Sequence, residues 1–300
     1  MSESSTAQQQ DILRPEIQAF FEEDTNTFSY VVKDPQSDAC AIIDSVLNFD
    51  MASGGVDYHS ADEIIAWVQE HKLKLEWIIE THVHADHLTA APYIQSKLGG
   101  KIGIGEKVIT VQETFKKIFN YKDEFQADGQ QFGHLFKENE HYKIGNLDGY
   151  PIHTPGHTPA CMTHVIGDAA FVGDTLFMPD AGTARADFPG GDAKVLFQSI
   201  QKILQLPDQT RVFMCHDYGT DDRKDLAFET TVAAERDANI HVNKNVAAEQ
   251  FVEMRTKRDK TLGMPHLILP SLQVNMRAGH FPEAEDNQVI YLKLPIDALS

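Results

Sequence analysis

The sequence predicts an α/β fold, and three observations support this expectation. Runs rich in β-branched and aromatic residues alternate with stretches in which apolar residues recur with helical spacing. Several runs end in histidine and aspartate, and open α/β sheets place their sites at such strand ends. The 300 residues, 42 % hydrophobic and 24 % charged, suit a large globular core. We expect a polar leader (residues 1–16), then one domain (17–300) with a short extension from about residue 240.

The first half of the chain predicts a hairpin followed by alternating helices and strands. "TFSYVVKDPQSDACAIIDSV" (27–46) has two β-rich runs around a turn. Ser60, with Glu63 three positions on, predicts a capping box at the start of a helix. The elements expected next are a buried strand at 75–82, a helix at 88–100 that Gly99 and Gly100 terminate, a short strand at 101–105 and a helix at 108–119.

The second half predicts further strands with polar ends. Residues 120–145 read as a long, mobile-looking segment before these strands. The stretches 150–167, 169–177 and 211–218 each carry potential ligand residues at a strand end, and a helix at 192–206 separates the last two. From about residue 240 we expect an appended helix and strand. No stretch is rich enough in Pro, Gly or Ser to mark a linker between two domains.

Composition excludes several classes of protein. The chain has 45 acidic and 26 basic residues, a net charge of −19, and this field would repel nucleic acid. No run approaches the length needed to span a bilayer, and the N-terminal stretch lacks the pattern of a secretory signal. The three cysteines are too few and too scattered for a disulfide framework. We expect reduced thiols in a cytoplasmic protein without nucleic-acid or membrane partners.

The stretch "IIETHVHADHLTAAP" (78–92) concentrates candidate metal ligands behind a strand. Imidazole and carboxylate together suit zinc, iron and manganese. Similar groups follow three other predicted strands, so the strand ends would bring seven side chains together. They are His82, His84, Asp86, His87, His157, Asp174 and His216. From residue types alone, either one metal or two could bind.

The segments "THVHADH", "TPGHT", "GD" and "CHDY", in this order, resemble the metallo-β-lactamase superfamily over nearly the whole chain. The resemblance implies a four-layer αββα sandwich with a metal site at one edge. In most members two metals generate a hydroxide that attacks an ester, amide or thioester. One metal would then bind His82, His84 and His157, the other Asp86, His87 and His216, with Asp174 bridging.

Three further stretches resemble the persulfide dioxygenase branch: "AGTARADFPGGDA" (181–193), "CHDYG" (215–219) and "PSLQVNMRAG" (270–279). This resemblance implies one Fe(II) per chain on His82, His157 and Asp174, with positions left open for substrate and dioxygen. The remaining four candidate ligands, His84, Asp86, His87 and His216, would then orient the others or hold a second metal. It also implies at least a homodimer.

The same resemblance implies that glutathione persulfide or a similar small persulfide is oxidised by dioxygen to sulfite, with release of glutathione. Arg185, Asn275 and Arg277 are candidates for holding the carboxylates of glutathione, because a guanidinium grips a carboxylate through two hydrogen bonds. Tyr218 is a catalytic candidate that donates its hydroxyl toward the reacting atoms. Cys161, although close to His157 in sequence, is interpreted as a small buried side chain.

Three alternatives stay open. A glyoxalase II type thioesterase would bind two metals, with zinc among them, and act without oxygen. An acyl-lactone hydrolase fits the full ligand set but gains no support from the "GTARADF" and "NMRAG" stretches. In a metal-stabilised binding module or sensor, protein side chains would be expected to fill every coordination position of the metal. This set instead looks like an open site with more candidate ligands than one metal needs.

Overall fold

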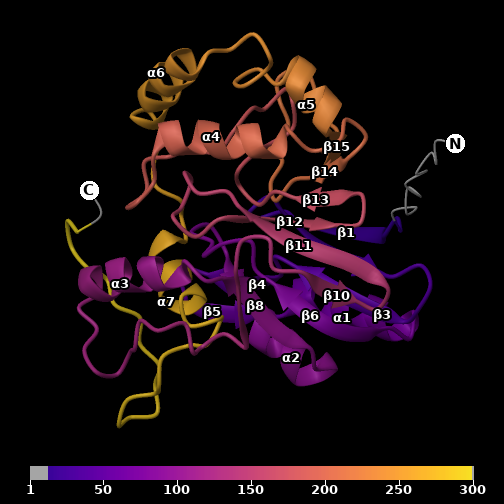
Figure 1. The fold of residues 1–300 in the computed structure, drawn as a ribbon. Coiled ribbons are helices and arrows are strands. Elements are labelled where there is room, and N and C mark those ends of the chain that lie inside the picture. The colour runs from indigo at the N-terminus through magenta and orange to yellow at the C-terminus, as the bar shows by residue number, and fades with distance from the viewer. Residues whose placement is uncertain (1–12, 299–300) are drawn as a thin grey trace, which may run out of the picture.

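The structure is a computed structural model that describes residues 13–298. Two six-stranded sheets form its centre (Figure 1). The first contains, in spatial order, β1 (Glu16–Glu22), β2 (Thr27–Lys33), β3 (Ala39–Ile43), β6 (Lys74–Ile79), β8 (Lys101–Gly105) and β9 (His134–Phe136). The second contains β10 (Tyr142–Ile144), β11 (Leu147–His153), β12 (Met162–Ile166), β13 (Ala169–Phe171), β14 (Arg211–Phe213) and β15 (Glu229–Thr231). A small third sheet has the order β5 (Gly55–Asp57), β4 (Val46–Asp50), β7 (Leu88–Thr89).

Helices cover the outer face of each large sheet. They are α1 (His59–Glu70), α2 (Ala91–Leu98), α3 (Val108–Ile118), α4 (Ala193–Ile203), α5 (Val232–Ala238), α6 (Ala248–Asp259) and α7 (Ile268–Asn275). Figure 1 shows α4, α5 and α6 above the second sheet, with α1 and α2 on the opposite side of the molecule, against the first. The predicted four-layer αββα sandwich is confirmed.

Three apolar cores follow from these layers. Ile43, Phe171 and Phe213 lie in the core between the sheets and are almost fully buried. A second core joins the first sheet to α1, α2, α3 and α7, and a third joins the second sheet to α4 and α6. Each fully buried large apolar side chain stabilises the fold by about 1.5–3 kcal/mol. The cores therefore fix the two sheets against each other, and with them the loops at their edge.

Most predicted elements of the first half are present, including the antiparallel hairpin of β2 and β3 and the helix that ends at Gly99. The predicted capping box is wrong. Helix α1 already begins at His59, with Tyr58 as its N-cap and no side-chain cap. The reason is that Asp57 Oδ1 accepts the backbone N–H of His59 at 2.8 Å, so the chain turns into the helix before Ser60.

Two predictions for the later chain need correction. Residues 120–145 are not merely a mobile-looking connection, because they contain β9, which pairs with β8, and Phe125, which is 2 % exposed. In the described residues after 240 there are two helices, α6 and α7, and no strand. Phe251 of α6 and Leu272 of α7 belong to different cores, so these helices pack into the sandwich.

The leader and the domain limits stay predictions. Strand β1 begins at Glu16, and residues 1–12 of the expected leader lie outside the described residues. In the described part of the chain, no helix combines the length and apolar character needed to cross a membrane. The three cysteines are free and buried.

Candidate metal centre

The histidine-rich loop that follows β6 is held in place by a residue from α7. Asn275 Nδ2 donates to the carbonyl oxygens of His84 (2.9 Å) and His87 (2.7 Å), and its Oδ1 accepts the N–H of Thr89 at 2.9 Å. Asn275 is 3 % exposed, so these bonds are made away from water. The C-terminal part of the chain thereby fixes the backbone that carries four of the candidate ligands.

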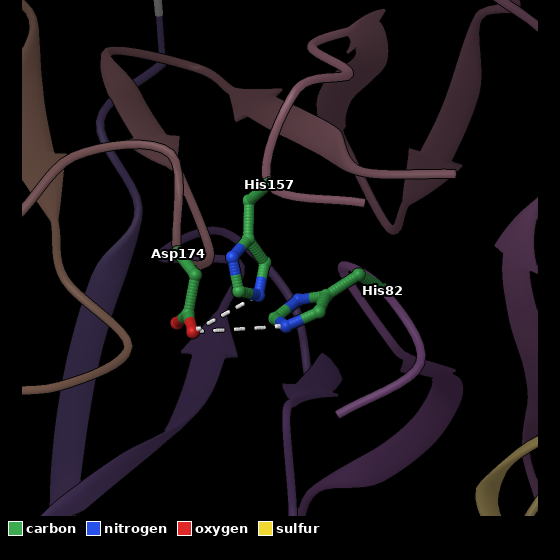
Figure 2. A group of neighbouring side chains, drawn as sticks. All are labelled: His82, His157 and Asp174. Atoms are coloured by element: carbon green, nitrogen blue, oxygen red, sulfur yellow. Dashed lines mark ion pairs between the residues drawn. The ribbon is translucent and has the colours of Figure 1, made fainter. Parts of the chain in front are cut away.

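His82, His157 and Asp174 meet at the edge of the sandwich (Figure 2). Their ligand atoms lie within 4.8 Å of one another. Asp174 Oδ2 is 3.8 Å from His82 Nε2 and 3.5 Å from His157 Nε2. The three come from the ends of β6, the loop after β11 and the end of β13. Two imidazoles and one carboxylate that occupy one face of the coordination sphere form the ligand set of many non-haem iron sites.

The hydrogen bonds around His82 define which of its nitrogens is free. Thr81 Oγ1 donates its proton to Asp44 Oδ2 (2.9 Å), so it can only accept from His82 Nδ1, 3.0 Å away. His82 therefore carries its proton on Nδ1, and Nε2 keeps its lone pair toward Asp174. Burial holds the pKa of His82 well below its ordinary value, and the imidazole stays neutral. Gly173 makes room for this arrangement, because a Cβ there would come within 2.6 Å of Thr81 Oγ1.

His157 is oriented in a similar way from another part of the chain. Its Nδ1 donates to the carbonyl oxygen of Arg185 at 2.9 Å, which leaves the Nε2 lone pair facing Asp174. The ring of Phe188 packs edge-on against the imidazole with a centroid separation of 5.3 Å. Both histidines of the group thus use Nδ1 in a hydrogen bond and turn Nε2 toward Asp174.

The other candidate ligands lie beside this group and are divided between two clusters. His84, Asp86 and His87 form one group of three, and His216 joins Asp174 and Cys215 in another. His84 Nε2 donates to Asp44 Oδ1 at 3.0 Å and lies 3.5 Å from Glu80. Although burial disfavours its charged form, the Asp44 carboxylate raises the pKa of His84 well above its ordinary value.

His216 connects the two clusters. Its Nε2 lies 3.2 Å from Asp86 and 3.3 Å from Asp174 Oδ1, the carboxylate oxygen that does not face His82. On the other side, Nδ1 donates to the carbonyl oxygen of Asn26 at 3.2 Å. Asp174 therefore faces His82 and His157 with Oδ2 and His216 with Oδ1.

The pattern of unpaired polar atoms fits a bound metal. Buried side-chain atoms normally have hydrogen-bond partners, because an unpaired one costs about 1–3 kcal/mol. In the described residues, the buried side-chain atoms without a hydrogen-bond partner include one atom from each of five of the seven candidate ligands. They are His82 Nε2, His84 Nδ1, His87 Nε2, Asp174 Oδ1 and His216 Nε2. A cation would satisfy atoms that the protein leaves unpaired.

The family model for the metallo-beta-lactamase superfamily matches residues 23–216, which include all seven candidate ligands. The chain belongs to the metallo-β-lactamase superfamily. Superfamily members bind metals, and the histidine and aspartate groups described above are groups that could hold a metal ion in this member.

Relatives within the superfamily carry names of two kinds. The chain is 51 % identical to a probable metallo-hydrolase of Burkholderia pseudomallei, over 94 % of this chain and 99 % of that one. It is 46 % identical to glyoxylase B2 of Dictyostelium discoideum (95 % and 98 % covered) and 28 % identical to the mitochondrial persulfide dioxygenase ETHE1 of Bos taurus (88 % and 88 %). The crystal structure of ETHE1 from Myxococcus xanthus aligns with a TM-score of 0.70 at 25 % identity, covering 88 % of this chain and all of that one.

A cavity of about 1280 Å³ opens onto the metal-binding groups of this superfamily member. His157, Asp174 and Asp86 line it, as does Tyr218. The Tyr218 ring stacks on His216 with centroids 5.9 Å apart. Solvent reaches 59 % of this side chain, yet the enclosing protein raises the pKa of Tyr218 to about 12. Its hydroxyl therefore stays a hydrogen-bond donor at neutral pH.

The three residues expected to bind glutathione lie in different surroundings. Arg185 lines the cavity, but its guanidinium is bonded to Asp187 through Nε (2.6 Å) and Nη2 (2.8 Å) and to the carbonyl oxygen of Gly263 (2.6 Å). Asn275 and Arg277 are not among the cavity-lining residues that the structure describes. Arg277 lies over the rings of Tyr121 and Phe125, 4.6 and 4.4 Å from their centroids. Their predicted contact with substrate stays a prediction.

Sequence reasoning missed three residues of this region. Asp44, in the turn after β3, sets the proton positions of His82 and His84, and only its place at a strand end could have suggested a role. His241 and Arg258 line the cavity, and neither follows a predicted strand. Cys161 is 2 % exposed and bonded to Thr158, as expected of a small buried side chain.

Proposed function

We propose that the chain is a persulfide dioxygenase that binds one ferrous iron through His82, His157 and Asp174. The observation that carries the proposal is the compact group of two imidazoles and one carboxylate. The likeness to ETHE1 from Myxococcus xanthus over that whole chain supports it. So do the "TARADF" and "NMRAG" stretches.

The reaction would convert glutathione persulfide, dioxygen and water into sulfite, glutathione and two protons. The outer sulfur is oxidised and takes up both atoms of dioxygen, and water then cleaves the sulfur–sulfur bond. Ferrous iron, when bound, supplies the redox chemistry that lets dioxygen react with sulfur. The protein supplies the neutral imidazoles, because Thr81 and the Arg185 carbonyl oxygen hold the Nδ1 protons of His82 and His157.

The remaining groups would orient substrate and ligands. Tyr218 keeps its proton and can donate it, as a hydrogen bond, to an oxygen or sulfur in the cavity. His216 Nε2 lies 3.3 Å from Asp174 Oδ1, so that Oδ2 is left for the group of three. Asp44 engages Nε2 of His84, and Asp86 is engaged by His216 and His87. In this proposal these pairs hold the ligands in orientation.

Metal content and oxygen uptake test the proposal together. Protein purified without oxygen should contain about one iron per chain, and glutathione persulfide should trigger oxygen uptake with release of sulfite. His82→Ala should lose both the iron and the activity. The control His134→Ala changes a partly buried histidine of β9 that pairs with Glu140, in the turn between β9 and β10 and outside the centre, and it should keep both. Two metals per chain without oxygen uptake would refute the proposal.

A two-metal hydrolase is the second candidate, because His87 Nε2 and His216 Nε2 are buried and have no hydrogen-bond partner in the described residues. The names of relatives at 46–51 % identity point the same way. This candidate predicts two metals, with zinc among them, and hydrolysis of S-lactoylglutathione under nitrogen. His216→Ala should then abolish hydrolysis together with binding of the second metal. Cytoplasmic location and assembly as a homodimer or larger homo-oligomer stay predictions for either candidate.

A further inference from the structure

The cavity next to the metal centre has walls of different character. Its volume of about 1280 Å³ exceeds the roughly 300–1,000 Å³ of most small-molecule sites. The hairpin of β4 and β5 contributes Asp50 and Asp57, and α6 with the segment after it contributes Arg255 and Arg258. A substrate that carries a carboxylate would therefore be repelled by the hairpin and attracted to α6.

Most cavity-lining arginine side chains are already engaged by protein groups. Arg185 is bonded to Asp187 and Gly263. Arg255 is 1 % exposed and bonded to Asp259 (2.7 Å) and to the carbonyl oxygen of Thr183 (3.0 Å). Neither guanidinium therefore has a pair of N–H donors left to bind a carboxylate ligand.

Arg258 differs from these two. It lies one turn after Arg255 on α6, is exposed and lines the cavity. Within residues 13–298 its guanidinium takes part in no hydrogen bond or ion pair, and only its carbonyl oxygen accepts bonds, one of them from Thr261. An arginine of this kind can grip a carboxylate through two parallel hydrogen bonds.

His241 supplies a second donor, and its position is tightly constrained. The backbone N–H of Thr183 donates to His241 Nδ1 at 3.0 Å, so the single proton of the neutral ring is on Nε2. Gly182, with φ +95°, allows this approach, since a Cβ there would lie 2.1 Å from Nδ1. Asn239 Oδ1 accepts the backbone N–H of His241 at 2.9 Å. Burial, together with the nearby charges of Arg255 and Arg258, lowers the pKa of His241 to about 4.

We propose that Arg258 and His241 form the subsite that binds a carboxylate of the thiol substrate, with His241 Nε2 donating beside the guanidinium. This inference rests on the proposed function in taking a glutathione-type thiol as substrate. The subsite itself belongs to the cavity, so it would serve a persulfide and a thioester of the same peptide alike. Leu262 and Met264, 40 % and 48 % exposed at the same wall, would cover the substrate's apolar atoms.

Binding of glutathione to the metal-loaded protein tests the subsite without turnover. Calorimetry should show that Arg258→Gln weakens glutathione binding about tenfold, and that Arg258→Lys weakens it less. Glutathione monoethyl ester, in which the glycine carboxylate is blocked, should bind the wild-type protein weakly and should lose little with Arg258→Gln. Lys257→Gln is the matched control, because Lys257 is the exposed neighbour on α6 and does not line the cavity.

Kinetics and metal analysis separate this proposal from the proposed function. If Arg258 binds the carboxylate, Arg258→Gln should raise KM about tenfold and change kcat far less, with the same metal content as wild type. Equal glutathione affinity of Arg258→Gln and wild type would overturn the subsite even where oxygen uptake is present. Loss of oxygen uptake in the wild type, with Arg258-dependent glutathione binding retained, would overturn the dioxygenase and leave the subsite standing.

Discussion

The carbonyl oxygen of Arg185 accepts a hydrogen bond from Nδ1 of His157 at 2.9 Å, and the guanidinium of the same arginine reaches Gly263 at 2.6 Å. One residue thus connects a candidate metal ligand with the segment that follows α6. The residue that orients His157 depends on contacts more than seventy positions away in the sequence.

Arg185→Gln removes the anchors on Asp187 and Gly263, so the carbonyl oxygen that orients His157 should lose its fixed position. Iron affinity should fall by about tenfold, as for other groups that orient a ligand. Competition with a chelator measures the iron affinity of the variant and of the wild type. The control Arg236→Gln removes an exposed pair with Asp208 and should leave iron affinity unchanged. Unchanged iron affinity with a raised KM would instead show that Arg185 contacts substrate directly.

Asp44→Asn should weaken metal binding although the side chain keeps its shape. The new amide NH₂ can donate to Thr81 Oγ1, which then donates to His82 Nδ1 and shifts the imidazole proton to Nε2. A protonated Nε2 offers no lone pair, so iron affinity should fall roughly 10- to 100-fold.

Asp34→Asn serves as the control. Asp34 is a buried carboxylate that accepts hydrogen bonds from Ser37 and Asn146, and neither partner is a candidate metal ligand. It should cost stability without changing metal affinity. Both variants are compared per folded chain, using thermal unfolding to measure the folded fraction. Equal metal affinity in Asp44→Asn and wild type would contradict the proton positions derived for His82.

Tyr218→Phe removes a hydroxyl that faces the cavity and leaves the ring stacked on His216. If this hydroxyl donates to the reacting atoms, kcat should fall by about tenfold or more while iron content stays at the wild-type level. Steady-state oxygen uptake measures kcat. A wild-type kcat would show that the hydroxyl takes no part in the reaction.

Glu235→Gln should stabilise the fold more at pH 8 than at pH 5. Burial raises the pKa of Glu235 to about 8, and its Oε1 has no hydrogen-bond partner in the described residues. An unfolded glutamate ionises near pH 4.3, so between about pH 4 and 8 the wild type loses stability as pH rises. Glutamine does not titrate and avoids this loss.

Urea unfolding at the two pH values measures the effect of Glu235→Gln. Relative to wild type, the variant's free energy of unfolding should rise by roughly 2–4 kcal/mol between pH 5 and pH 8, at about 1.4 kcal/mol per pKa unit. Glu253→Gln, on the exposed side of α6, is the control and should show no such dependence. A difference that is the same at both pH values would mean that Glu235 is ionised in the folded protein.

Local sequence was sufficient for the sheets and for the set of potential ligands. Strands such as β6 are short, apolar runs, and the polar side chains that follow them have to lie at the sheet edge. His82, His157 and Asp174 could therefore be expected to meet, and they do. The start of α1 was misplaced because Asp57, two residues before the helix, competes with Ser60 for the first turn.

What the sequence by itself determined is an α/β fold and the residue types available to a metal, since both follow from periodicity and from residues close together in the chain, whereas the αββα layering was implied by the family resemblance. Only the tertiary structure decided which nitrogen of His82 is free, that Asn275 holds the histidine loop and that the Arg258 guanidinium has no partner within residues 13–298. These properties depend on hydrogen bonds between residues that the chain brings together from distant positions. A guanidinium that already has an acceptor and one that has none look alike in sequence, and only their neighbours in the fold distinguish them.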